Sequence, residues 1–133
     1  MTLRLGAIDV GTNTVLLTIA TSDGQKLVPL VERATITRLG QGVDQSGELH
    51  PDARARTLAC LENYRALCDA HGVTRLLAVG TSALRDARDG GAFREKAREI
   101  LGVALEIIPG EREAALTFRG GISGIDWAAV TPH

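Results

Sequence analysis

Residues 3–20 read LRLGAIDVGTNTVLLTIA and predict two β-strands joined by a short turn. The first strand, Leu3–Val10, is apolar along most of its length, as expected of a buried strand. The second, Thr14–Ala20, carries apolar residues at every second position, so one of its faces should be buried. Gly11-Thr12-Asn13 lies between the two strands, and we therefore expect a hairpin.

The remainder of the chain alternates strands with helices. We expect a third strand over Lys26 to about Ala34, a glycine-rich loop over Thr35–His50, a helix over Pro51–His71, a fourth strand over Thr74–Val79, one or two helices over Ser82–Leu101, a fifth strand over Val103–Ile108 and a last helix from Gly110 to about Arg119. Two of the helices join strand to strand, so the strands that they join should be parallel. The order β-β-β-α-β-α-β-α predicts an α/β fold with a five-stranded mixed sheet, which is one half of the actin-like ATPase, or ribonuclease H-like, architecture.

Composition narrows the class of protein. A chain of 133 residues has the size of one domain. Its net charge of −1 argues against a nucleic-acid binder, which normally needs a basic surface. No apolar stretch approaches the roughly 20 residues of a membrane span, and no signal peptide is evident, so we expect a cytoplasmic location. Cys60 and Cys68 lie in one predicted helix roughly 12 Å apart, too far for a disulfide, and should be reduced buried thiols.

Three polar segments each follow a predicted strand, and together they indicate a phosphate site. They are Asp9–Thr14, Gly80–Arg85 and Pro109–Glu113. Because ligands of open α/β sheets bind at the carboxyl ends of strands, these segments should meet in one cleft. They would supply carboxylates, an arginine and free backbone N–H groups, which suit a phosphoanhydride.

Each segment alone also has a simpler explanation. Asp9 could serve only as an acceptor for turn N–H groups, and Thr81 or Ser82 only as a helix cap. Acidic residues favour the first turn of a helix, and this preference alone would explain Glu113 without a catalytic role. Glu111 is an equal candidate for a general base. Arg85 opposes the helix dipole in its predicted position, which favours an anionic partner.

Other polar residues carry weaker signals. The three histidines are scattered without metal-ligand spacing. We interpret Arg54, Arg56 and Arg65 as a solvated helix face. Arg38 comes just before the glycines of the glycine-rich loop and is placed to face a polyanion.

With these segments identified, the chain resembles the exopolyphosphatase / guanosine pentaphosphate phosphohydrolase (Ppx/GppA) family. Five segments carry the resemblance, in family order along nearly the whole chain. They are Ala7–Thr14, Arg38–Gly42, Arg56–Leu58, Val79–Ala87 and Ile107–Ala114.

The resemblance implies a Mg²⁺-dependent hydrolase that releases the terminal phosphate of inorganic polyphosphate or guanosine pentaphosphate. Carried over residue by residue, it implies a phosphate loop at Gly11, Thr12, Asn13 and Thr14, a residue near the metal at Asp9, a substrate-binding arginine at Arg85 and a catalytic glutamate at Glu113, which would activate the attacking water. It resolves the choice between Glu111 and Glu113, since the family's glutamate directly precedes its alanine.

The chain also departs from the family pattern. Threonine replaces serine at Thr12 and Thr14, Arg112 stands where an acidic residue is common, and Pro109 where serine is common. A second phosphate loop of the type Asp-Ile-Gly-Gly-Gly-Ser-Thr-Glu is not found after Gly124. We therefore expect a domain over residues 1–124 and a tail over 125–133, an N-terminal half-domain with negligible turnover alone. The alternatives are a non-catalytic phosphate- or nucleotide-binding module and a half-domain that self-associates as a homodimer.

Overall fold

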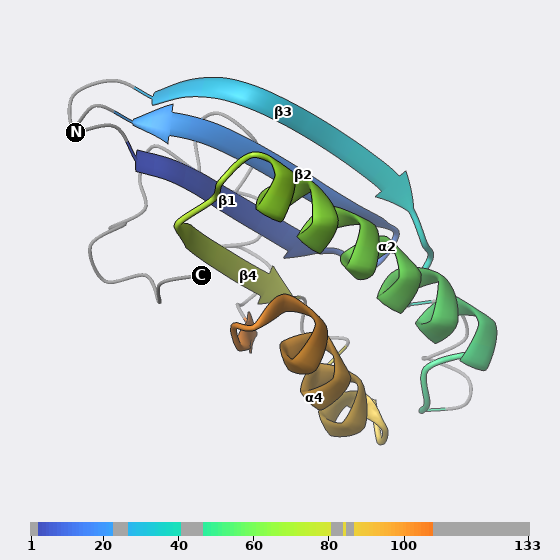
Figure 1. Ribbon diagram of the computed structural model, residues 1–133. Coiled ribbons are helices and arrows are strands. Elements are labelled where there is room, and N and C mark those ends of the chain that lie inside the picture. The colour runs from blue at the N-terminus through green and yellow to red at the C-terminus, as the bar shows by residue number, and fades with distance from the viewer. Residues whose placement is uncertain (1–2, 23–26, 41–46, 81–83, 85–86, 108–133) are drawn as a thin grey trace.

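A computed structural model describes residues 3–22, 27–40, 47–80, 84 and 87–107. Its centre is a five-stranded sheet in the order β3-β2-β1-β4-β5 (Figure 1). The strands are β1 (Leu3–Val10), β2 (Thr14–Ser22), β3 (Leu27–Ile36), β4 (Arg75–Gly80) and β5 (Leu105–Ile107).

The pairing of the strands is mixed, as the sequence predicts. β2 is antiparallel to both β1 and β3, whereas β4 is parallel to both β1 and β5. β1 therefore lies at the middle of the sheet, between an antiparallel and a parallel neighbour. This is the α/β arrangement of a ribonuclease H-like, or actin-like, half-domain, and the predicted fold class is confirmed.

Several strand boundaries differ from the predicted ones: β2 extends to Ser22 instead of Ala20, and β4 spans Arg75–Gly80 instead of Thr74–Val79. β3 continues to Ile36, because Thr35 and Ile36 pair with Val15 and Thr14 of β2. The predicted loop that begins at Thr35 is thus wrong by two residues. β5 begins at Leu105 rather than Val103, since the turn at Gly102 takes up the preceding residues.

Two helices are described, α2 (Pro51–Ala70) and α4 (Gly90–Leu101). The His50 ring caps α2 by accepting the N–H of Asp52 at 3.1 Å, and Pro51 occupies the first turn, where no N–H is needed. α2 stops before Gly72, whose φ of +67° suits glycine. α4 stops in the same way before Gly102.

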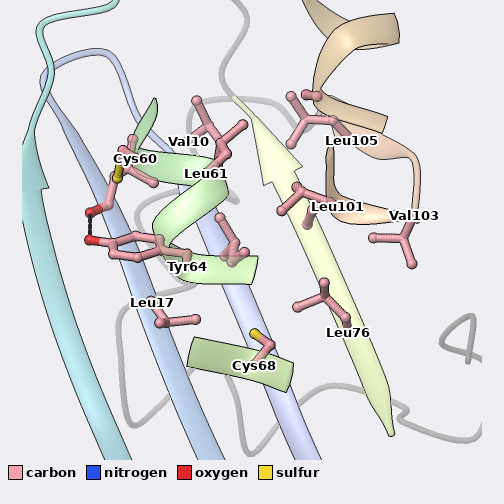
Figure 2. Close-up of a cluster of buried hydrophobic side chains, with 14 of the residues drawn as sticks. Val10, Leu17, Cys60, Leu61, Tyr64, Cys68, Leu76, Leu101, Val103 and Leu105 are labelled. Atoms are coloured by element: carbon pink, nitrogen blue, oxygen red, sulfur yellow. Dashed lines mark hydrogen bonds between the residues drawn. The ribbon is translucent and has the colours of Figure 1, made fainter. Parts of the chain in front are cut away.

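Both helices pack on one face of the sheet, where the core forms (Figures 1 and 2). Residues of α2 such as Leu61 and Tyr64 contribute to the same cluster as Leu76 of β4 and Leu101 of α4. Tyr64 joins α2 to the sheet through hydrogen bonds to Thr35 Oγ1 at 2.7 Å and to the carbonyl of Val15 at 3.1 Å.

Burial governs the titrating groups in this core. Burial raises the pKa of Tyr64 to about 12 and that of Cys68 to about 11, and it also raises the pKa of Cys60. Both cysteines are free and buried, as expected. Because burial disfavours the charged forms, these groups stay neutral in the folded protein at ordinary pH.

The arginines of α2 are not a purely solvated face, and this correction matters for the site. Arg54 forms an ion pair with Asp89 at 3.1 Å. Arg56 donates to the carbonyl of Thr37 at 3.1 Å, and Arg65 donates to the carbonyl of Ile100 at 2.8 Å. Each guanidinium therefore connects α2 to another part of the fold.

Two predictions fall outside the described residues, namely the last helix from Gly110 to about Arg119 and the domain boundary at residue 124. Within the described part of the chain, neither helix combines the length and the apolar character that crossing a membrane requires.

Candidate functional site

Asp9 lies near the carboxyl end of the central strand, on the face of the sheet away from the helices. Its neighbours Ile8 and Val10 point into the core beneath α2 and α4, so the alternation of a strand turns Asp9 the other way. Its cross-strand partners are Leu16 on β2 and Val79 on β4. Asp9 is half-buried, and its Oδ1 atom is fully buried. The carboxylate therefore sits at the mouth of the hairpin turn with apolar neighbours on both sides.

In the turn from Gly11 to Thr14, some of the backbone N–H groups are paired and others are available to a ligand. The Gly11 N–H donates to the carbonyl of Thr14 at 3.0 Å, which closes the turn. The carbonyls of Thr12 and Asn13 are both used as acceptors by a neighbouring segment. Among the described residues, no hydrogen bond is formed by the N–H groups of Thr12 and Asn13, and both residues are exposed. The turn thus has two carbonyls that are bonded to another segment and two N–H groups that can still donate. Neighbouring N–H groups without partners are typical of an anion-binding turn.

The segment that holds these carbonyls is residues 37–40, directly after β3. The N–H groups of Thr37 and Arg38 both donate to the carbonyl of Asn13 at 3.0 Å, and the N–H of Gly40 donates to that of Thr12 at 2.9 Å. Sequence reasoning missed this support. The run of Arg38-Leu39-Gly40 was its only local signal, because the contact joins parts of the chain some 25 residues apart.

Arg85 lies outside the described residues, whereas Leu84 before it and Ala87 two positions after it are described. Leu84 and Ala87 on either side of it are buried, at 1% and 5% exposure. A Cβ added to Gly80 at the end of β4 would press on the Leu84 side chain at 2.8 Å. Glycine at this position therefore allows Leu84 to pack against the carboxyl end of β4, next to β1 and the Gly11–Thr14 turn.

Asp89 lies just before α4 and bonds to the loop before α2. It was not among the site residues predicted from the sequence. Its Oδ1 accepts the N–H of Leu49 at 2.9 Å, and its Oδ2 accepts from Arg54 at 3.1 Å. The N–H of Arg88 donates to the carbonyl of Gly47 at 2.8 Å. The loop before α2 and the loop before α4 are thus joined through Arg88 and Asp89.

The other predicted site residues have different outcomes. The structure brings Asp9 and the turn Gly11–Thr14 together, whereas Arg85 and the catalytic candidate Glu113, with its competitor Glu111, lie outside the described residues. Among the described residues no cluster of three or more His, Cys, Asp or Glu side chains is present. A Mg²⁺ ion does not require one, since it commonly binds one or two carboxylates together with substrate phosphates. The hard oxygens of Asp9 fit that requirement.

The sequence profile of the Ppx/GppA phosphatase family matches residues 18–131. Among known proteins, exopolyphosphatase 2 of Mycobacterium tuberculosis is 39% identical over 136 residues, which cover 96% of this chain and 43% of that protein. A guanosine-5'-triphosphate,3'-diphosphate pyrophosphatase of Photobacterium profundum is 32% identical over 114 residues, covering 86% of this chain and 23% of that protein.

The fold is likewise similar to solved structures. The crystal structure of the Aquifex aeolicus member of the Ppx/GppA protein family superposes with a TM-score of 0.79 and 36% sequence identity, covering 84% of this chain and 37% of that one. The chain therefore spans about two fifths of the length of the Mycobacterium tuberculosis and Aquifex aeolicus proteins.

Proposed function

This chain belongs to the Ppx/GppA phosphatase family, and from that premise we propose that it forms the phosphate-binding half of a Mg²⁺-dependent phosphoanhydride hydrolase. Its substrate would be inorganic polyphosphate or guanosine pentaphosphate, from which the terminal phosphate is released. The proposal rests on the turn Gly11–Thr14, which begins two residues after the half-buried Asp9. In this turn the N–H groups of Thr12 and Asn13 have no hydrogen-bond partner among the described residues.

In this proposal the turn binds the phosphate that is to be transferred. The N–H groups of Thr12 and Asn13 and the hydroxyls of Thr12 and Thr14 donate to its oxygens. Because hydrogen bonds hold the turn from behind, these donors need no rearrangement when charge develops on the phosphate, and such preorganised donors are a large part of catalysis.

Asp9 would hold Mg²⁺, which when bound neutralises charge on the phosphate oxygens. Arg85 would donate to the same phosphate from the segment after β4. Glu113 would orient a water and accept its proton as the water attacks the terminal phosphorus, while the rest of the phosphate chain departs with the electrons of the P–O bond that breaks.

Phosphate release tests the proposal. The chain is incubated at high concentration with polyphosphate, with and without Mg²⁺, beside the variants Glu113→Gln and Glu111→Gln. We expect Mg²⁺-dependent release that is negligible beside the turnover of a complete enzyme but detectable at this concentration, and that the first variant abolishes and the second preserves. Equal release by all three proteins, or release unaffected by removal of Mg²⁺, would contradict the assignment of Glu113 or of the metal.

A further inference from the structure

Arg38 has a backbone conformation that its residue type disfavours. Its φ is +54°, and among the described residues it is the only non-glycine residue with a positive φ. The Cβ of an L-residue crowds the neighbouring carbonyl in this region, so the conformation persists only where surrounding contacts impose it.

The contacts that impose it come from the Gly11–Thr14 turn. The N–H of Arg38 shares the carbonyl of Asn13 with the N–H of Thr37. The next residue, Leu39, is 1% exposed and belongs to the core, which fixes the chain immediately after Arg38. On the other side, Arg56 donates to the carbonyl of Thr37. Three contacts thus fix the backbone around Arg38, and one of them joins it directly to the proposed phosphate turn.

The side chain of Arg38 is exposed, although its backbone is anchored. In the described part of the chain its guanidinium makes no hydrogen bond or ion pair, whereas Arg54, Arg56, Arg65 and Arg88 all do. An exposed cation with five donors therefore belongs to the segment that contacts the Gly11–Thr14 turn, and among the described residues its hydrogen-bonding capacity is unused. This is a combination that phosphate groups recognise well.

We propose that Arg38 is a further binding residue, which contacts the phosphates next to the one held by Gly11–Thr14. The inference rests on the proposed function of that turn and deepens it. Since the turn and Arg38 belong to different segments, one phosphate would occupy the turn and a linked phosphate would reach Arg38. The site would then select a linear phosphoanhydride chain over a single phosphate.

Binding of a short linear polyphosphate and of orthophosphate tests this inference, using the whole chain and calorimetry. Arg38→Ala and Arg38→Gly should weaken polyphosphate binding about tenfold, as loss of one charge-assisted hydrogen bond would, and leave orthophosphate binding unchanged. Arg38→Lys should retain most of the affinity. The matched control is Arg33→Ala, which removes another exposed arginine, from β3, and should change the affinity less than twofold.

Arg38→Gly also controls for folding. Glycine adopts a positive φ without strain, so this variant should unfold at a higher temperature than the parent while it binds polyphosphate less tightly. Unchanged polyphosphate affinity in both Arg38 variants, an equal loss in Arg33→Ala, or no polyphosphate binding by the parent would overturn the inference. The proposed hydrolysis fails separately, because binding that depends on Arg38 without any Glu113-dependent phosphate release would refute only the catalytic assignment.

Discussion

The N–H of Gly40 donates to the carbonyl of Thr12 at 2.9 Å, and the two residues approach so closely that a Cβ on Gly40 would collide with Thr12 Cγ2. The contact places the segment after β3 directly behind the proposed phosphate turn. Glycine is favoured here by this close approach and not by a positive φ angle, which Gly40 does not have.

Gly40→Ala should therefore displace the turn. We expect a loss of about 2 kcal/mol in the free energy of unfolding, as for other overpacked sites, together with weaker polyphosphate binding. Urea denaturation and calorimetry measure the two effects. Gly91→Ala is the matched control, because no atom lies within 4 Å of a Cβ at that position, and it should leave both quantities unchanged or improve stability. Equal behaviour of the two variants would contradict the close approach.

Thr37 and Thr57 offer a second matched pair, since both are fully buried threonines. In the described structure Thr37 Oγ1 has no hydrogen-bond partner, whereas Thr57 Oγ1 donates to the carbonyl of Ala53 at 2.8 Å. Thr37→Val should raise the free energy of unfolding by about 1 kcal/mol, because it removes an unsatisfied hydroxyl from the interior. Thr57→Val removes a satisfied hydroxyl and should not stabilise the protein. Chemical denaturation decides, and a destabilised Thr37→Val protein would show that its hydroxyl is satisfied.

Asp89→Ala should loosen the two loops that flank α2 and α4. It removes the acceptor of the Leu49 N–H and of Arg54, so we expect a loss of about 1–2 kcal/mol in unfolding free energy. Glu95→Ala is the control, because its ion pair with Arg98 spans 3.6 Å between two exposed side chains. If the two variants lose the same small amount of stability, Asp89 does not connect the loops in solution.

Stability should fall at alkaline pH because of groups in the core. Burial raises the pKa of Tyr64 to about 12 from 10.0 and that of Cys68 to about 11 from 9.0. Between pH 9 and 12 the unfolded chain releases these protons while the folded chain retains them, so unfolding becomes more favourable as pH rises. The stabilisation is complete below pH 9 and is lost progressively above it.

Tyr64→Phe isolates the tyrosine contribution. At pH 7 it should lower the free energy of unfolding by about 1 kcal/mol through the lost hydrogen bonds to Thr35 and Val15. Between pH 10 and 12 its stability should decline less steeply than that of the parent. Urea titrations at several pH values compare the slopes, and parallel curves would exclude ionisation of Tyr64 as a cause.

Features encoded by neighbouring residues were predictable from sequence. The apolar run Leu3–Val10 and the alternation after it predict the hairpin, and Pro51 and Gly72 mark the bounds of α2. The position of Asp9 at the end of a buried strand also follows from the sequence. The parallel pairing of that strand with β4 does not, because α2 joins β4 to β3 and not to β1.

Features that depend on distant residues were not predictable in the same way. Arginine is a residue type usually found at solvated positions, so the sequence places Arg56 on the surface. Only the folded chain shows that Arg56 donates to the carbonyl of Thr37. The positive φ of Arg38 contradicts the preference of its residue type, so local propensity argues against it. Both depend on the contact between residues 12–13 and 37–40, which no local pattern records.

The hydrogen bonds from residues 37–40 to the Gly11–Thr14 turn connect the proposed ligand site with the outermost strand of the sheet. Terminal strands fray more readily than central ones. A phosphate chain bound to the turn would favour the state in which β3 is fully attached, so amide hydrogen exchange at Thr37 and Gly40 should slow as ligand is added. Hydrogen exchange at this edge of the sheet would therefore indicate whether a ligand occupies the site.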